Sequence, residues 1–224
     1  MRSLVFSFKK RRHYGNSHIK HFSAADLRCF LHRYALRLIG ALLLIIGLAA
    51  GSIYAENADS SMMFSLDFLF TTNLEARLSQ NMISIFCACF ASDFIFLFAV
   101  FLLGLAPWGI LLMPAVALFK GFGTGLTAGY LFITYGLKGA GFYLLVLLPG
   151  TFLFCLALVT LLSYSFAFSK NMFGILISRS SIPAPVWGNL LDFCSRSVSA
   201  LLMTFLASML DSVLWTLFAG TFNF

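Results

Sequence analysis

Three ionisable side chains interrupt long apolar runs and are the first candidates for chemistry: Asp93, Lys120 and Asp211. A charge at the centre of a bilayer costs about 2.5–3.5 kcal/mol, so such residues should face protein and pair. Asp93 stands eleven residues before Gly104, and Lys120 stands eleven residues after Gly109. At 1.5 Å per helical residue, both lie about 16 Å from the same membrane surface. We therefore predict that Lys120 pairs with Asp93 or with Asp211.

This charge cluster has three interpretations. An internal ion pair that sets the register of the helices is the favoured one, because it removes the cost of isolated charges. An ion or proton path and a contact with a partner's transmembrane helix are the alternatives.

The distribution of histidine argues against catalysis. All four His precede residue 33, so no membrane span supplies a His ligand or a Ser–His dyad. The chain has no HExxH or P-loop motif, and its five cysteines form no CxxC pair. Neither intramembrane Asp follows a Gly-x-Gly element of the kind found in intramembrane aspartyl proteases. We therefore predict no catalytic residue, no metal site and no cofactor.

A glycine pattern indicates close helix packing. Gly121, Gly125 and Gly129 recur at every fourth position, and Gly47 and Gly51 repeat the spacing near the N-terminus. On a helix such residues share one face, which lets two backbones approach closely in lipid. Packing inside the chain is the favoured interpretation. A contact with another membrane protein and a backbone-lined substrate path are the alternatives.

The composition indicates that transmembrane helices carry the charged and glycine residues described above. The 224 residues are 60% hydrophobic and 10% charged, with a mean hydropathy of +0.93, whereas soluble domains average about 25% charged residues. We predict an all-α, polytopic transmembrane bundle over residues 35–224. Its spans, about five in number, are placed at 36–54, 82–103, 110–133, 141–168 and 200–220. Pro149 and Gly150 are expected to kink or break the fourth span.

The charges predict an orientation. Nine of the fifteen Lys and Arg lie at or before Arg37, and residues 1–34 form a basic N-terminal arm. Residues 55–81 are acidic, and residues 169–199 are read as a polar loop with a helix breaker at 181–185. The positive-inside rule then places the arm and this loop in the cytoplasm and the C-terminus outside. A basic arm beside a hydrophobic segment favours contact with anionic lipids rather than nucleic acid.

Several motifs occur in a characteristic order. Ser79-Gln80-Asn81 precedes the second span, and Gly104-Leu105-Ala106-Pro107-Trp108-Gly109 follows it. Pro114, Phe119-Lys120-Gly121-Phe122-Gly123-Thr124-Gly125 and Leu147-Leu148-Pro149-Gly150-Thr151 come next. With this order, residues 36–222 resemble the stage II sporulation protein M family. Many broader relatives carry a His and a Glu near the fourth-span proline, and this chain has neither.

The resemblance implies a non-catalytic scaffold in the plasma membrane of an endospore-forming bacterium. Such a scaffold holds a membrane-anchored peptidoglycan hydrolase, which recruits a second hydrolase at the septum during engulfment. No catalytic residue is carried over, because the enzymes are the partners. A membrane subunit of a transporter, either an ABC-2-like permease or a small-solute channel, is the alternative. The sequence leaves a homo-oligomer open.

Overall fold

The computed structural model describes residues 24–57, 81–178 and 186–218. The chain divides into two units, Met1–Tyr34 and Ala35–Phe224. In the first unit, the structure describes only the helical backbone of residues 24–34. The second unit contains the membrane-spanning helices.

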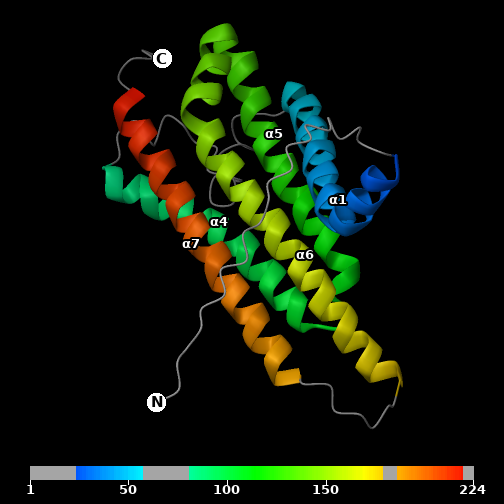
Figure 1. Cartoon of the computed structure of the whole chain (residues 1–224). Helices are drawn as coiled ribbons and strands as arrows, with labels where there is room; N and C mark the ends of the chain where they lie inside the picture. The colour runs from blue at the N-terminus through cyan, green and yellow to red at the C-terminus, as the bar shows by residue number, and fades with distance from the viewer. Residues whose placement is uncertain (1–23, 58–80, 179–185, 219–224) are drawn as a thin grey trace, which may run out of the picture. The chain divides into compact units, whose positions relative to one another are not determined.

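All regular elements in the described ranges are helical, as predicted (Figure 1). They are α1 (Ala24–Tyr54), η1 (Ala55–Asn57), α4 (Met82–Leu105), α5 (Gly109–Phe142), the π-helical η2 (Tyr143–Leu147), α6 (Leu148–Ser178) and α7 (Val186–Phe218). Four stretches are long and apolar enough to cross a membrane: Ala35–Tyr54, Met82–Leu105, Gly109–Ile175 and Gly188–Phe218. The predicted all-α, polytopic membrane fold is thereby confirmed.

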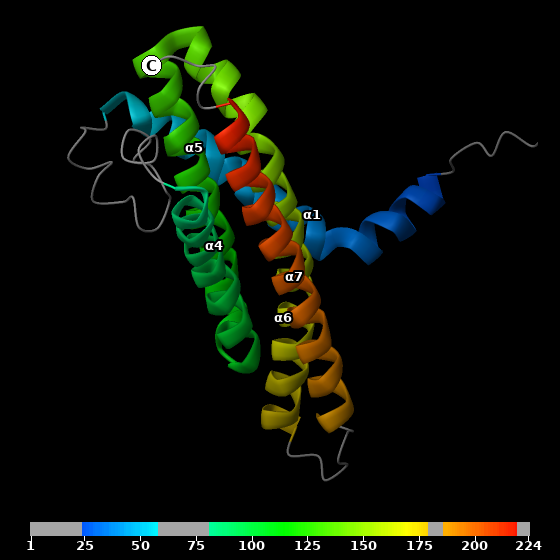
Figure 2. The ribbon, with the colours of Figure 1, turned by 90° about the vertical axis from the view of Figure 1, so that its left-hand side faces the viewer.

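The stretch Gly109–Ile175 folds back on itself. Its 67 residues would extend about 100 Å as one straight helix, roughly three times the hydrocarbon thickness. Gly136 departs from helical geometry, with φ 59° and ψ −136°. Lys120 and Phe154 stand on opposite sides of this residue in sequence, yet the Lys120 Nζ lies 4.8 Å from the Phe154 ring centroid. α5 and α6 are therefore antiparallel neighbours (Figures 1 and 2), and the 67-residue stretch comprises two helical segments that run in opposite directions.

The backbone stays helical across Pro149-Gly150, where the sequence suggested a break. The irregularity lies just before, in the π-helical η2, where the Leu148 N–H bonds to the Tyr143 carbonyl. Proline lacks the N–H that would continue the α-helical ladder, and a widened π-turn accommodates that loss. The change of chain direction occurs at Gly136 instead.

Most of the polar loop predicted at 169–199 is helical, and that prediction is corrected. α6 continues to Ser178, and α7 begins at Val186. The two helices stay together because apolar and aromatic residues recur among the polar ones: the Phe168 and Phe193 rings stack with centroids 4.9 Å apart. The helix breaker at 181–185, most of the acidic segment 55–81 and residues 1–23 of the arm lie outside the described residues.

The apolar core falls into two main clusters along the bundle. One includes Val100, Ala117, Phe154 and Ala207. The other includes Cys89, Leu131, Leu147 and Trp215. On three helices a polar or small position separates the two clusters: Asp93 on α4, Gly150 on α6 and Asp211 on α7. The bundle thus has a polar layer between two apolar layers.

Candidate functional site

An ion pair between α4 and α5 is the centre of the polar layer. The Lys120 Nζ lies 2.7 Å from the Asp93 Oδ1, and the two side chains are only 6% and 10% exposed. At this separation the ammonium donates a hydrogen bond to the carboxylate, and charge-assisted bonds of this kind are strong. The structure thus joins two of the three ionisable residues singled out from the sequence.

Two aromatic rings complete the surroundings of the ammonium. Lys120 Nζ lies 4.9 Å from the Phe96 ring centroid and 4.8 Å from that of Phe154. The face of an aromatic ring carries partial negative charge and attracts a cation, most strongly where water is absent. Three helices therefore surround the Lys120 ammonium, since α4 supplies Asp93 and Phe96 while α6 supplies Phe154.

The third predicted charge, Asp211, lies against the backbone of α6. Its carboxylate is buried and occupies the space where a side chain at Gly150 would begin. Any residue other than glycine at position 150 would overlap Oδ1 of Asp211. Gly150 therefore acts by leaving room for a carboxylate from α7, rather than by breaking α6.

A tight turn between α4 and α5 sets the register of the ion pair. The Ala106 N–H bonds to the Leu102 and Leu103 carbonyls, and the Gly109 N–H bonds to the Ala106 carbonyl. A Cβ atom at Gly109 would overlap the Leu103 carbonyl, so only glycine fits there. With the reversal this short, residues equally far from it lie at the same depth, as Asp93 and Lys120 do.

The glycine face of α5 packs against α1. Gly121 and Gly125 lie against the carbonyls of Leu44 and Leu48, and a Cβ atom at Gly129 would come within 2.7 Å of the Ala55 Cβ. Close backbone approach of this type gains van der Waals contact that lipid cannot replace. The three glycines therefore form a helix–helix contact within the chain.

The contact is reciprocal. Gly47 and Gly51 of α1 lie directly against the α5 backbone, at the Leu118 carbonyl and at Phe122. Lys120 stands between these two α5 positions, so the packing of α1 on α5 holds the helix segment that carries the ion pair.

The polar layer offers acid–base and cation-binding groups but no metal-binding cluster. Among the described residues, no three His, Cys, Asp or Glu side chains gather closely enough to hold a metal ion. Sequence reasoning missed the two rings over Lys120, because nothing distinguishes Phe96 and Phe154 among 27 phenylalanines. It also missed the contact of Asp211 with Gly150, which depends on the relative placement of α6 and α7.

Comparison with known proteins adds no relationship: no protein-family model, no curated protein and no solved structure matches the chain. The helices and their hydropathy identify it as a multi-span helical membrane protein.

Proposed function

We propose that this protein is a non-catalytic scaffold of the bacterial plasma membrane. In this role it anchors a membrane-bound peptidoglycan hydrolase and, through it, a second septal hydrolase during engulfment of the forespore. Its N-terminus lies in the cytoplasm and its C-terminus outside. The observation that carries this function is the order of sequence motifs along residues 36–222, which resembles that of the stage II sporulation protein M family.

The positions of the motif residues support a structural role. Gly104 approaches Phe193, because a Cβ atom there would lie 2.7 Å from the Phe193 Cζ. Lys120 bonds to a carboxylate of α4, and Gly150 receives a carboxylate of α7. Each of these motif residues thus joins two helices, as expected where motifs preserve a framework and the partners perform the chemistry.

The closed surroundings of Lys120 also favour a scaffold over a transporter. An ionisable residue that serves an ion or proton path exchanges partners with solvent or substrate during the cycle. Lys120 is buried, bonded to Asp93 and covered by two aromatic rings. Such a group is well suited to hold three helices in one arrangement.

The direct test is affinity purification from sporulating cells of an endospore-forming bacterium that express the tagged full-length chain. The expected result is enrichment of a membrane-anchored peptidoglycan hydrolase, with a second wall hydrolase recovered through it. A tagged polytopic protein of similar size serves as the control for non-specific membrane contacts. Recovery of an ATPase subunit, with no wall hydrolase, would overturn the scaffold in favour of a permease.

Localisation provides a second test of the same function. A fluorescent fusion should gather at the septal and engulfing membranes, and deletion of the gene should disperse the fluorescently tagged hydrolase. A hydrolase that still reaches the septum in the deletion strain would contradict the proposed role.

A further inference from the structure

Two arginines from different helices meet on one tyrosine. The Arg37 guanidinium of α1 lies 5.8 Å from the Tyr164 ring centroid, and the Arg196 guanidinium of α7 lies 4.1 Å from it. Arg37 also donates a hydrogen bond of 3.3 Å to the Tyr164 hydroxyl. The guanidiniums of two helices therefore contact the same tyrosine side chain.

The cluster of Arg37, Tyr164 and Arg196 lies at the depth of lipid head groups. Tyr164 is ten residues beyond Phe154, the ring that covers Lys120. Ten helical residues extend about 15 Å, which equals half the thickness of the hydrocarbon layer. Arg37 stands near the start of the apolar stretch Ala35–Tyr54, which agrees with this depth. The positive-inside bias assigns this end of the bundle to the cytoplasm.

Cavities lie on both sides of the arginine–tyrosine cluster, between α6 and α7. Toward the membrane centre, a cavity of about 320 Å³ is lined by Leu156, Thr160, Ala200 and Met203, together with Tyr164 and Arg196. The membrane-facing cavity is mostly apolar, so an acyl chain suits it.

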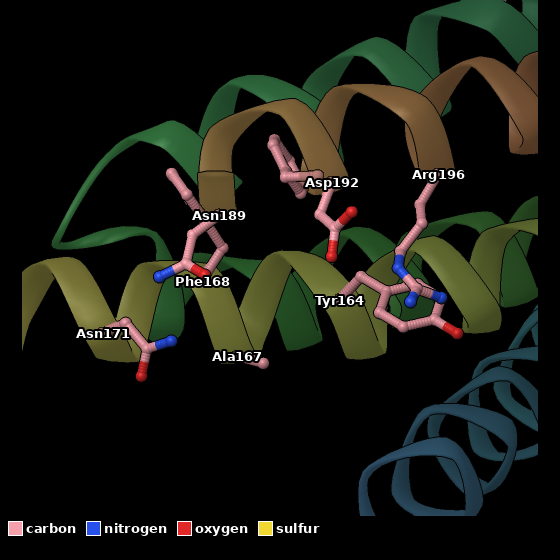
Figure 3. A pocket seen from close by; sticks show the side chains of 8 residues that line it. Tyr164, Ala167, Phe168, Asn171, Asn189, Asp192 and Arg196 are labelled. Atoms are coloured by element: carbon pink, nitrogen blue, oxygen red, sulfur yellow. The ribbon is translucent and has the colours of Figure 1, made fainter. Parts of the chain in front are cut away.

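The cavity on the other side is smaller, and its lining combines amide and charged side chains with the rings of Phe168 and Phe193. It has a volume of about 120 Å³, and Asn171, Asn189 and Asp192 line it together with Tyr164 and Arg196. Figure 3 shows Asp192 and Arg196 pointing from α7 toward α6, where Tyr164 lies. Amide groups and a guanidinium at this level suit the polar head of a lipid.

The charge around the cluster favours an anion. Arg37 and Arg196 supply two positive charges at the ring. Asp192, one turn before Arg196, supplies the opposing negative charge. A net positive site at this depth attracts anionic lipid by about 1 kcal/mol per basic residue.

We infer that Arg37, Tyr164 and Arg196 form a binding site for an anionic phospholipid of the cytoplasmic leaflet. The two guanidiniums bind the phosphate, and one acyl chain occupies the membrane-facing cavity between α6 and α7. This site is separate from residues 1–34 and goes beyond the proposed scaffold function, since it requires no hydrolase partner. A bound lipid would bridge α1, α6 and α7.

The test is native mass spectrometry of the full-length protein in detergent, titrated with phosphatidylglycerol or phosphatidylcholine. The wild type should retain phosphatidylglycerol preferentially. Arg37→Gln and Arg196→Gln should each weaken its binding about five-fold, as expected for the loss of one basic contact. The matched control, Lys170→Gln, removes an equal charge from the same end and should leave binding nearly unchanged. Equal weakening by Lys170→Gln would indicate diffuse attraction and overturn the site.

Two further measurements test the lipid site without changing either arginine. Thr160→Leu narrows the acyl cavity and keeps both arginines, so it should reduce phosphatidylglycerol retention without lowering the unfolding temperature in lipid-free detergent. Glycerol phosphate at millimolar concentration should fail to displace the lipid. Displacement by glycerol phosphate would identify a site for soluble phosphate instead. Unchanged retention in Thr160→Leu, Arg37→Gln and Arg196→Gln would show that the arginines serve helix packing alone.

Discussion

Asp93 and Lys120 are each unfavourable alone in the membrane, but as an ion pair they stabilise the bundle. Either charge alone in the bilayer centre is unfavourable, whereas together they neutralise one another and the rings of Phe96 and Phe154 cover the cation. The bundle should therefore be more stable with both charges, or with neither, than with one charge alone.

Replacing one member of the pair should destabilise the protein strongly. We expect Asp93→Asn to lower the free energy of unfolding by about 3 kcal/mol, because it leaves the Lys120 ammonium buried without its carboxylate. The double variant Asp93→Leu with Lys120→Met should recover most of that loss. Thermal unfolding in detergent measures both effects. Asp192→Asn, at an exposed carboxylate, is the control, and an equal loss there would contradict the importance of the pair.

Replacing Gly150 with alanine should lower the stability of the protein, whereas the same replacement usually stabilises a helix. Alanine is favoured over glycine inside helices by about 1 kcal/mol, so Gly174→Ala should stabilise α6, because nothing lies within 4 Å of a Cβ atom there. Gly150→Ala should instead destabilise it, because the new methyl group overlaps the Asp211 carboxylate. Adding Asp211→Ser should restore stability by shortening that side chain. If Gly150→Ala behaves like Gly174→Ala in thermal unfolding, the contact with Asp211 is not as described.

At the scale of helices, α1 and α5 are in close contact, since glycines on both sides bring backbone against backbone. Leucine at Gly125 would occupy the position of the Leu48 carbonyl and force the helices apart. We expect Gly125→Leu to reduce accumulation in membranes and to lower the unfolding temperature by several degrees. Gly174→Leu provides the matched control on an exposed helix face. Equal accumulation of the two variants would contradict tight packing of α1 on α5.

Hydropathy finds the long apolar helices but locates the ends of helices poorly. Each predicted span overlaps an observed helix, because the bilayer demands about 20 apolar residues whatever the fold. The predicted loop at 169–199 is wrong because α6 and α7 continue past the apolar region, held by pairs such as Phe168 and Phe193. The reversal at Gly136 lies within the connection between the spans predicted at 110–133 and 141–168, whereas Pro149-Gly150, where the sequence suggested a break, stays helical.

The part of the candidate site that could be predicted from the sequence is the part set by the short turn between α4 and α5. The equal depth of Asp93 and Lys120 follows from counting residues on either side of the turn between α4 and α5. The rings over Lys120 and the meeting of Arg37 with Arg196 depend on how distant helices pack. Residue counting along one helix carries no information about those contacts.

For the whole molecule, we predict five crossings, which would place the start of α1 and the end of α7 on opposite sides of the membrane. A phosphatase that is active only outside the cytoplasm can test this arrangement as a fusion. We expect activity for fusions after Asn57, Lys138 and Phe218, and none for fusions after Pro107 and Gly188. If Gly109–Ile175 crossed only once, the fusion after Gly188 would be active and the fusion after Phe218 inactive.

The Lys120–Asp93 pair also bears on how the chain enters the membrane during synthesis. α4 leaves the ribosome before α5, and at that stage the Asp93 carboxylate has no Lys120 ammonium to neutralise it. The turn between α4 and α5 is so short that Lys120 follows only 27 residues later. The two helices would thus enter the bilayer together as a neutral hairpin, and α4 alone would be a poor substrate for the insertion machinery. A chain truncated just after α4 should therefore be retained less firmly in the membrane than one that extends through α5.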